Sequence, residues 1–277
     1  MQSPAEVGAD THVSIATRFV AARRAASALP GYPGPLPADI AFGYRCQDAA
    51  IALWPDRVVG WKVGYIAPER REPGGDERLV GPIFARAVWT AGDGVVDVPV
   101  FAGGFAAVEA EYVFRVGADA PAGKTDWTAA DAAAIADALH VGVEMAGSPL
   151  STINDLGPAV VVSDFGNNAG LILGAAIADW RHREPSSLAC AVSIDGREAG
   201  RGGAASIAGG PLAALAFALS RNARRGRPLR AGDLVTTGAA TGIHAIVAGQ
   251  SALVDFGAHG RIACRAVAAT PRSGDDA

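Results

Sequence analysis

The chain has 277 residues, half of them apolar, and a formal net charge of -4. This length and apolar share suffice for a substantial buried core, in one large domain or two closely packed ones. The acidic balance argues against a nucleic-acid-binding surface, which needs clustered Lys and Arg. The one basic run, Arg221 to Arg227, is interpreted as a solvated helix end.

Neither export nor membrane insertion is expected. The three cysteines, Cys46, Cys190 and Cys264, are far apart and form no CxxC pair, which fits a reducing cytoplasm better than a disulfide framework. No apolar stretch approaches the roughly 20 residues that span a bilayer, and the start, MQSPAEVGADTH, lacks the features of a signal peptide. We therefore expect a cytoplasmic protein with no membrane partner.

The first part of the chain is predicted to be helical. Apolar residues recur at helical spacing from Val13 to Leu29, where GYPGPLP ends the helix, and a second helix is expected from Ala38 to Leu53. From Val58 the pattern changes to short β-branched runs separated by glycine. The predicted strands are VVGWKVG, GVVDVPV, VEAEYVFRVG, ALHVGVEM, AVVVSDF, AGLILGAAI, LACAVSIDG, DLVTTG, HAIVAGQSALVDFG and GRIACRAV.

Two more helices interrupt these strands. One is expected over TAADAAAIADAL, with Thr128 as N-cap and Asp131 at the third helical position, and the other from Pro211 to Ala223. Many short strands with few helices predict an α+β fold in which a mixed sheet rolls into a sandwich or barrel. We expect a single domain over 1–277, with a helical portion at about 1–57, a β-rich core at about 58–268 and a disordered tail at 269–277.

A nucleotide site is the weaker alternative. GADAPAGKT, Gly117 to Thr125, lies between a strand and a helix, as a P-loop does, but five residues separate its glycines where the motif requires four. No GxGxxG, GxSxG or HExxH occurs. A Rossmann cofactor site, a nucleophile elbow and a zinc site therefore have no local support.

Two glutamates stand out in VEAEYVF. Strand residues two apart share a face, with Cα atoms roughly 6.5 to 7 Å apart, so Glu109 and Glu111 project together, close enough to hold one cation. Val113 continues their face, and Ala110 and Tyr112 share the opposite one. Two anions in such apolar surroundings repel each other and lose hydration unless a cation or protonation compensates.

Two further acids follow apolar runs. Glu144 lies in HVGVEMAG, and Asp164 ends AVVVSDF. Carboxylates from separate strands, without His or Cys, would form a hard oxygen site suited to Mg²⁺ or Mn²⁺. The alternative is that the two glutamates of VEAEYVF face water on an edge strand and that Asp164 caps a turn.

Lys62 is the cationic candidate. It stands between Trp61 and Val63 in VVGWKVGYI, where a lysine is costly to bury without a partner. Burial lowers the pKa of a lysine, and a nearby carboxylate restores it. The alternative is a long side chain whose ammonium reaches solvent.

Five segments together resemble the 2-keto-4-pentenoate hydratase and 4-oxalocrotonate decarboxylase family of the fumarylacetoacetate hydrolase superfamily. The resemblance covers roughly Ile40 to Val267, in the same order. The segments are GWKVG (60–64), VEAEYVF (108–114), VGVEMAGSPL (141–150), SDFGNNAGLILG (163–174) and AGDLVTTGAATG (231–242). The resemblance implies a mixed β-roll with an N-terminal helical portion, a divalent cation and a homo-oligomer.

The resemblance also implies roles for individual residues. The metal carboxylates fall on Glu109, Glu111 and Glu144, and the family lysine falls on Lys62. Lys62 would neutralise the substrate carboxylate or move a proton, and both roles stay open. Candidates for contacts to substrate or to the metal ligands are Asp164, Asp76 and Arg78.

The implied reaction is the addition of water to a 2-hydroxy-2,4-dienoate, which gives a 4-hydroxy-2-oxo acid in aromatic catabolism. The nearest alternative is decarboxylation of a 2-oxo-3-hexenedioate, because the same site could stabilise the dienolate left by loss of CO₂. The charged loop from Glu69 to Arg78 could admit such a dianion through Arg70, Arg71 or Arg78. Further alternatives are a C–C hydrolase of acylpyruvates and a non-catalytic partner of an active homologue.

Overall fold

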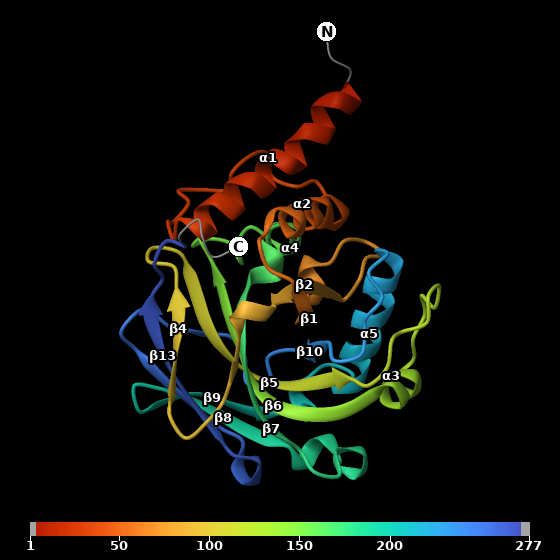
Figure 1. Cartoon of the computed structure of the whole chain (residues 1–277), viewed down its shortest axis with the longest axis vertical. Helices are drawn as coiled ribbons and strands as arrows, with labels where there is room; N and C mark the ends of the chain where they lie inside the picture. Colours follow the sequence, from red (N-terminus) through yellow and green to blue (C-terminus); the bar gives the residue numbers. More distant parts are fainter. Residues whose placement is uncertain (1–3, 273–277) are drawn as a thin grey trace.

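Two β-sheets form the body of the protein in the computed structural model, which describes residues 4–272 (Figure 1). The first contains β1 (Val58–Tyr65), β2 (Arg78–Phe84), β3 (Val88–Thr90), β5 (Phe105–Val116), β6 (Ala136–Ser148), β7 (Asn168–Ala176), β10 (Leu234–Thr236) and β11 (His244–Ala245). The second contains β4 (Val95–Val100), β8 (Ala189–Ile194), β9 (Arg197–Gly203), β12 (Ser251–Asp255) and β13 (Arg261–Ala268).

Both sheets are mixed. The order of the first is β2-β1-β10-β5-β6-β7-β3, with β11 also paired to β5, and the order of the second is β4-β13-β12-β8-β9. β1 runs parallel to β10 and β4 parallel to β13, whereas β5 and β6 are antiparallel. The α+β class with a mixed, rolled sheet is therefore confirmed.

Helices cover the sheets at one end and along one side (Figure 1). The helices are α1 (Pro4–Arg24), α2 (Ile40–Leu53), α3 (Ala129–Ile135), α4 (Pro158–Ser163) and α5 (Pro211–Arg224). The side chain of Asp39 accepts a hydrogen bond from Phe42 N and thereby caps α2. The predicted N-terminal helical portion is present, but its first helix begins earlier than Val13 and ends at Arg24, before Ala26 adopts a φ of 50°.

The two faces of β5 have different neighbours. Tyr112 points toward the second sheet, where its ring lies 5.9 Å from that of Phe256 in an edge-to-face pair. The opposite face turns into the roll, because the first sheet curls until β2 contacts β7. Side chains from four strands of this sheet fill part of the interior: Ile83, Val113, Leu171 and Leu234.

One predicted strand is a helix. AVVVSDF was expected to be extended because of its valines, but Pro158–Ser163 forms α4. Gly157, with a φ of 104°, is the N-cap, and Pro158 occupies the first turn, where its missing N–H costs nothing. Burial of Val160 and Val162 in this conformation outweighs the strand preference of β-branched residues.

Other element boundaries also differ from expectation. The helix capped by Thr128 and Asp131 is present, but it ends at Ile135, because Ala136 already pairs with β5. Strands β2, β3 and β9 were not predicted. β2 was taken as part of a charged loop, and its Pro82 is tolerated because β2 is an edge strand.

The arginine run at the end of α5 is only partly solvated, because the side chain of Arg224 is exposed and that of Arg225 is buried. The guanidinium of Arg225 stacks on Tyr44 at 4.3 Å and on Trp61 at 5.5 Å, and its side chain is only 8% exposed. Both Arg225 and Arg227 pair with Asp48. Ring faces and one carboxylate thus replace water around this charge.

Within residues 4–272, no helix combines the length and apolar character needed to cross a bilayer. The chain end is held as far as Arg272, whose N–H donates to Arg24 O, while Ala269 N donates to Val100 O. The rest of the predicted disordered tail, 273–277, lies outside the described residues.

A left-handed turn links α4 to β7. Phe165, Gly166 and Asn167 have φ values of 55°, 64° and 64°, a conformation that costs free energy for residues other than glycine. The turn lies directly against β2. A Cβ at Gly81 would be 2.0 Å from the carbonyl oxygen of Phe165, so only glycine permits this approach.

We expect Gly81→Ala to lower the free energy of unfolding by about 1–3 kcal/mol or more, because backbone must move to accept the methyl group. Gly92→Ala is the matched control, since nothing lies within 4 Å of its added Cβ. Urea denaturation of both variants measures the difference. Equal midpoints for the two would contradict the close packing of the turn on β2.

Candidate metal centre

Strand pairing brings three glutamates into one buried cluster. Glu109 and Glu111 lie on the same face of β5, and Glu144 on β6 is directly opposite Glu109 in the antiparallel register. Their exposed fractions are 4%, 0% and 0%. One carboxylate oxygen from each lies within 4.8 Å of the others. The solvent-exposed edge-strand alternative is therefore wrong.

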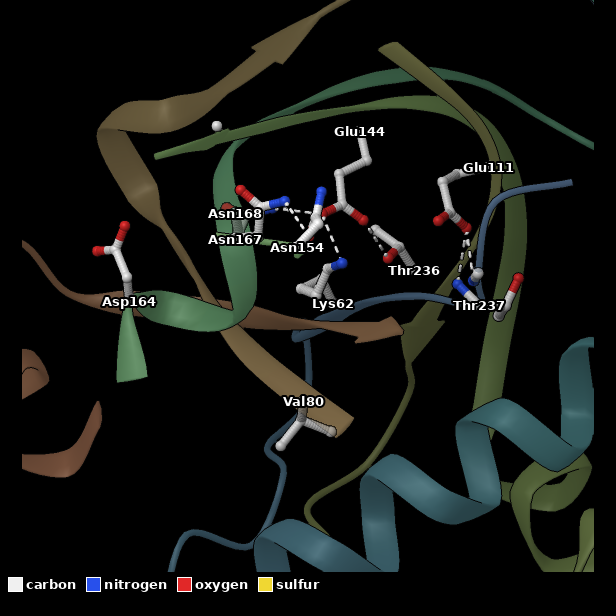
Figure 2. Close-up of polar contacts among 12 residues, drawn as sticks. Lys62, Val80, Glu111, Glu144, Asn154, Asp164, Asn167, Asn168, Thr236 and Thr237 are labelled. Atoms are coloured by element: carbon white, nitrogen blue, oxygen red, sulfur yellow. Dashed lines mark hydrogen bonds and ion pairs between the residues drawn. The ribbon is translucent and has the colours of Figure 1, made fainter. Parts of the chain in front are cut away.

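Hydrogen bonds orient the carboxylates of Glu111 and Glu144 (Figure 2). Glu111 Oε2 accepts from the backbone N–H groups of Thr237 at 3.0 Å and Gly238 at 2.8 Å, which follow β10. Glu144 Oε1 accepts from Asn168 Nδ2, and its Oε2 accepts from Thr236 Oγ1, both at 3.2 Å. The donors come from segments far apart in the sequence.

Lys62 lies beside these acids. Its Nζ is 3.2 Å from Glu144 Oε1, and the residue is 6% exposed, so the ammonium does not reach out to solvent. Gly60 allows β1 to lie close to β10, because a Cβ there would meet Leu234 O at 2.1 Å. Lys62 is thus held inside the roll as the counter-charge of the cluster.

The cluster has more negative than positive charge. Burial lowers the pKa of Lys62, but the carboxylates of Glu144, Glu109 and Glu111 outweigh it, so the pKa is raised and the ammonium persists. Burial raises the pKa of Glu109 to about 7, against the opposing effect of Lys62. Burial and the neighbouring carboxylates raise the pKa of Glu111 well above its ordinary value. Without a cation, the cluster therefore retains protons.

The donor set fits a hard divalent cation. All the converging ligand atoms are carboxylate oxygens, which Mg²⁺ and Mn²⁺ prefer. Glu111 Oε1 is buried and has no hydrogen-bond partner, as expected of an atom reserved for a cation. A cation would also relieve the repulsion that raises the two pKa values.

A cavity of about 310 Å³ adjoins the cluster. Lys62 and Glu109 line it together with two amide side chains, Asn154 and Asn167. Apart from Arg70, the remaining wall is largely apolar and includes Tyr65, Ile66, Leu79, Pro158, Val161 and Ile243. A small acid could therefore lie between apolar walls with its polar end toward the glutamates.

The asparagines were not assigned a role from the sequence. Asn167 Nδ2 donates to Asn154 Oδ1 at 3.2 Å, and Asn168 supports Glu144. The segment GNN could have indicated a left-handed turn, because asparagine is among the few residues that adopt positive φ values readily. Thr236 and Thr237, in DLVTTG, were likewise missed.

Asp164 does not join the glutamates. Figure 2 shows it apart from Glu111 and Glu144. Its carboxylate pairs with Arg23, at 2.5 Å from Nε and 2.9 Å from Nη2, and accepts from Ser148 Oγ at 2.6 Å. The predicted contact to substrate or ligands is replaced by an ion pair that fixes α1 to the start of the left-handed turn. The side chain of Asp164 thus contacts α1 and the end of β6 instead of the three glutamates.

Neither Asp76 nor Arg78 lines the cavity beside the glutamates. Asp76 pairs with Arg221 at 3.2 Å. Arg78 is buried, donates to Ala208 O and pairs with Glu77. The structure therefore separates both from the cluster.

No family model matches the chain. A 2-keto-4-pentenoate hydratase of Burkholderia vietnamiensis is 32% identical over 188 residues, which are 66% of this chain and 68% of the relative. A 4-oxalocrotonate decarboxylase of a Pseudomonas species is 28% identical over 197 residues, or 70% and 73% of the two chains. The chain therefore belongs to the 2-keto-4-pentenoate hydratase and 4-oxalocrotonate decarboxylase family.

Solved structures support the same fold. The 4-oxalocrotonate decarboxylase from Pseudomonas putida G7, solved with magnesium and adipate, matches with a TM-score of 0.78 over 94% of this chain and 98% of that chain. The sequence identity is 20%. The expected fold of the fumarylacetoacetate hydrolase type is thereby confirmed.

We expect Glu111→Gln to weaken Mg²⁺ binding by about 10- to 100-fold or more. Loss of a residue that merely supports a metal ligand already has an effect of this size. Glutamine keeps an acceptor for the N–H groups of Thr237 and Gly238 and removes the cost of burying or protonating a carboxylate on folding, so the metal-free protein should unfold at a higher urea concentration. Calorimetric Mg²⁺ titration checks the first effect. Glu198→Gln, which breaks an exposed pair with Arg201, is the control. Parent-like affinity in Glu111→Gln would exclude Glu111 as a ligand.

Proposed function

We propose that the protein is a divalent-metal-dependent lyase that adds water to a 2-hydroxy-2,4-dienoate and yields a 4-hydroxy-2-oxo acid. The observation that carries this proposal is the buried cluster of Glu109, Glu111 and Glu144, which one ammonium balances only in part and which adjoins a cavity. The family relationship to 2-keto-4-pentenoate hydratases supports the choice of substrate.

The three glutamates would hold Mg²⁺ or Mn²⁺. A bound cation supplies Lewis-acid stabilisation of the charge that develops on the oxygen at C2 of the substrate. Asn168 and Thr236 donate hydrogen bonds to the two carboxylate oxygens of Glu144 and keep this side chain in place beside Lys62. Glu111 is likewise fixed by two backbone donors. The protein thus presents oriented oxygens before any ligand arrives.

Lys62 would act on the substrate itself. Its ammonium lines the cavity and persists at neutral pH, so it can pair with the substrate carboxylate or deliver a proton to carbon during tautomerisation. The apolar wall keeps bulk water away from the diene. One water molecule then adds its oxygen to C4 and a proton reaches C3, which completes the hydration.

Decarboxylation of a 2-oxo-3-hexenedioate is the second candidate. It requires the same stabilisation of charge at the C2 oxygen, after loss of CO₂ instead of addition of water. Two observations favour it: the relative named 4-oxalocrotonate decarboxylase, and the presence of Arg70 in the cavity wall. Arg71 and Arg78, the other candidates for admitting a dianion, do not line the cavity.

Removal of the metal tests the proposal. EDTA should abolish consumption of 2-hydroxypenta-2,4-dienoate, followed by its ultraviolet absorbance, and Mg²⁺ or Mn²⁺ should restore it. Parallel assays with a 2-oxo-3-hexenedioate measure CO₂ release. Turnover by metal-stripped protein would contradict the mechanism, and CO₂ release as the dominant reaction would favour the second candidate. Failure to bind metal would point to a non-catalytic partner subunit.

Lys62→Met should separate binding from catalysis. Methionine keeps the apolar stem and removes the ammonium, so turnover should fall by about 10² to 10⁴, the range of a lost acid–base group. Mg²⁺ should bind at least as tightly, because the charge that competes for Glu144 is gone. Calorimetry and steady-state kinetics on the same preparation give both values. A fully active variant would remove Lys62 from the mechanism.

A further inference from the structure

A second cavity lies on the other side of the left-handed turn from the metal centre. Its volume is about 220 Å³, and the described residues that line it differ from those that line the cavity beside the glutamates. Phe165 and Asn168 belong to its wall, whereas Asn167 belongs to the wall of the other cavity. The turn thus separates the two cavities, and the proposed reaction makes no use of this one.

Aromatic side chains form one wall of this second cavity, which we call the aromatic cavity. The ring centres of Phe84 and Phe165 are 4.9 Å apart, and that of Trp54 lies 5.7 Å and 5.6 Å from them. Phe101, directly after β4, also lines it. Because these rings hold one another by tilted and edge-to-face packing, they present an ordered apolar surface to a flat group.

Arg23, at the end of α1, contributes a buried guanidinium to the same wall. Nε and Nη2 donate to the carboxylate of Asp164, Nη2 also donates to Gly147 O, and Nη1 donates to Asn168 O. These bonds engage four of the five N–H donors of a guanidinium. The charge of Arg23 is offset by Asp164, and its remaining N–H is a donor of Nη1.

Arg272 contributes a second guanidinium. The segment that carries it is held by Ala269 N, which donates to Val100 O, and by Arg272 N, which donates to Arg24 O. The guanidinium lies 4.8 Å from the centre of the Trp54 ring. Because a guanidinium has five N–H donors in a planar fork, it can bind a carboxylate while it keeps other partners.

The polarity of the wall selects the charge of a ligand. Among the described residues, no Asp or Glu lines the aromatic cavity, and its charged side chains are those of Arg23 and Arg272. Such a wall offers cationic donors without an anionic acceptor. It therefore disfavours a cationic ligand and favours an anion.

We propose that the aromatic cavity binds a small aromatic carboxylate. The ring would lie against Trp54 and the phenylalanines, and the carboxylate would accept hydrogen bonds from Arg272. The cavity suits a ligand with about one ring, because drug-sized ligands occupy cavities of about 300–1,000 Å³. This site does not depend on the proposed function, since neither the glutamates nor Lys62 line it.

Benzoate is the probe, and its dissociation constant is measured by calorimetry on the full chain. We expect a value on the order of 1 mM for so small a ligand. Benzyl alcohol, which lacks the charge, should bind about tenfold more weakly. Cyclohexanecarboxylate, which lacks the aromatic ring, should bind about 2- to 10-fold more weakly than benzoate. Each titration is run with Mg²⁺ and again with EDTA, because a carboxylate held at the glutamates would need the cation.

Two variants locate the ligand. Arg272→Met should weaken benzoate about tenfold and leave benzyl alcohol unchanged, since methionine removes only the charge-assisted hydrogen bonds. Arg24→Met is the matched control, because Arg24 is exposed and does not line the cavity. Ala87→Leu keeps both guanidiniums but places a larger side chain at a lining position, so it should weaken benzoate and benzyl alcohol alike.

Several results would overturn the inference. They are no binding of benzoate, binding that disappears in EDTA, equal affinity in Arg272→Met and Arg24→Met, or parent-like affinity in Ala87→Leu. None of these results bears on the hydration assay, which tests the proposed function separately.

Discussion

Three carboxylates and one ammonium are buried together inside the rolled sheet, and the surrounding structure compensates in part for the excess of negative charge. An uncompensated buried charge costs several kcal/mol, so the cluster persists only because neighbouring groups reduce this cost. Backbone donors after β10 hold Glu111, side chains of Thr236 and Asn168 hold Glu144, and Lys62 supplies one positive charge. The raised pKa values of Glu109 and Glu111 show that the compensation is incomplete without a cation.

The register of β5 and β6 makes this arrangement possible. Glu109 opposes Glu144 across the pair, and the alternation along β5 sends Tyr112 to the opposite face, against Phe256, which directly follows β12 of the other sheet. A slip of one residue would exchange the faces, placing carboxylates in the core between the sheets and an aromatic ring among the ligands. The edge-to-face pair and the cluster therefore depend on the same register, so core packing on one face fixes the chemistry on the other.

Short sequence patterns predicted those parts of the site that depend only on neighbouring residues. The spacing of Glu109 and Glu111, and the glycines on either side of Lys62, are visible within a few residues. The position of Asp164 could not be predicted locally, because its partner Arg23 is 141 residues away in the sequence. In addition, the segment before Asp164 forms a helix that begins at Gly157 and Pro158. The asparagines depend in the same way on a left-handed turn that Gly81, on another strand, accommodates. Long-range contacts decide such positions, and composition or periodicity cannot specify them.

The charge layout also explains why a cation would bind here. With all groups ionised, the three glutamates and Lys62 carry two uncompensated negative charges, which oppose the entry of a carboxylate. Without a cation, the raised pKa values of Glu109 and Glu111 favour protonated carboxyls, which remove charge but supply no Lewis acid. A divalent cation held by the three glutamates would offset both charges and supply Lewis-acid chemistry, so burial of the carboxylates favours the binding of a cation over the uptake of protons.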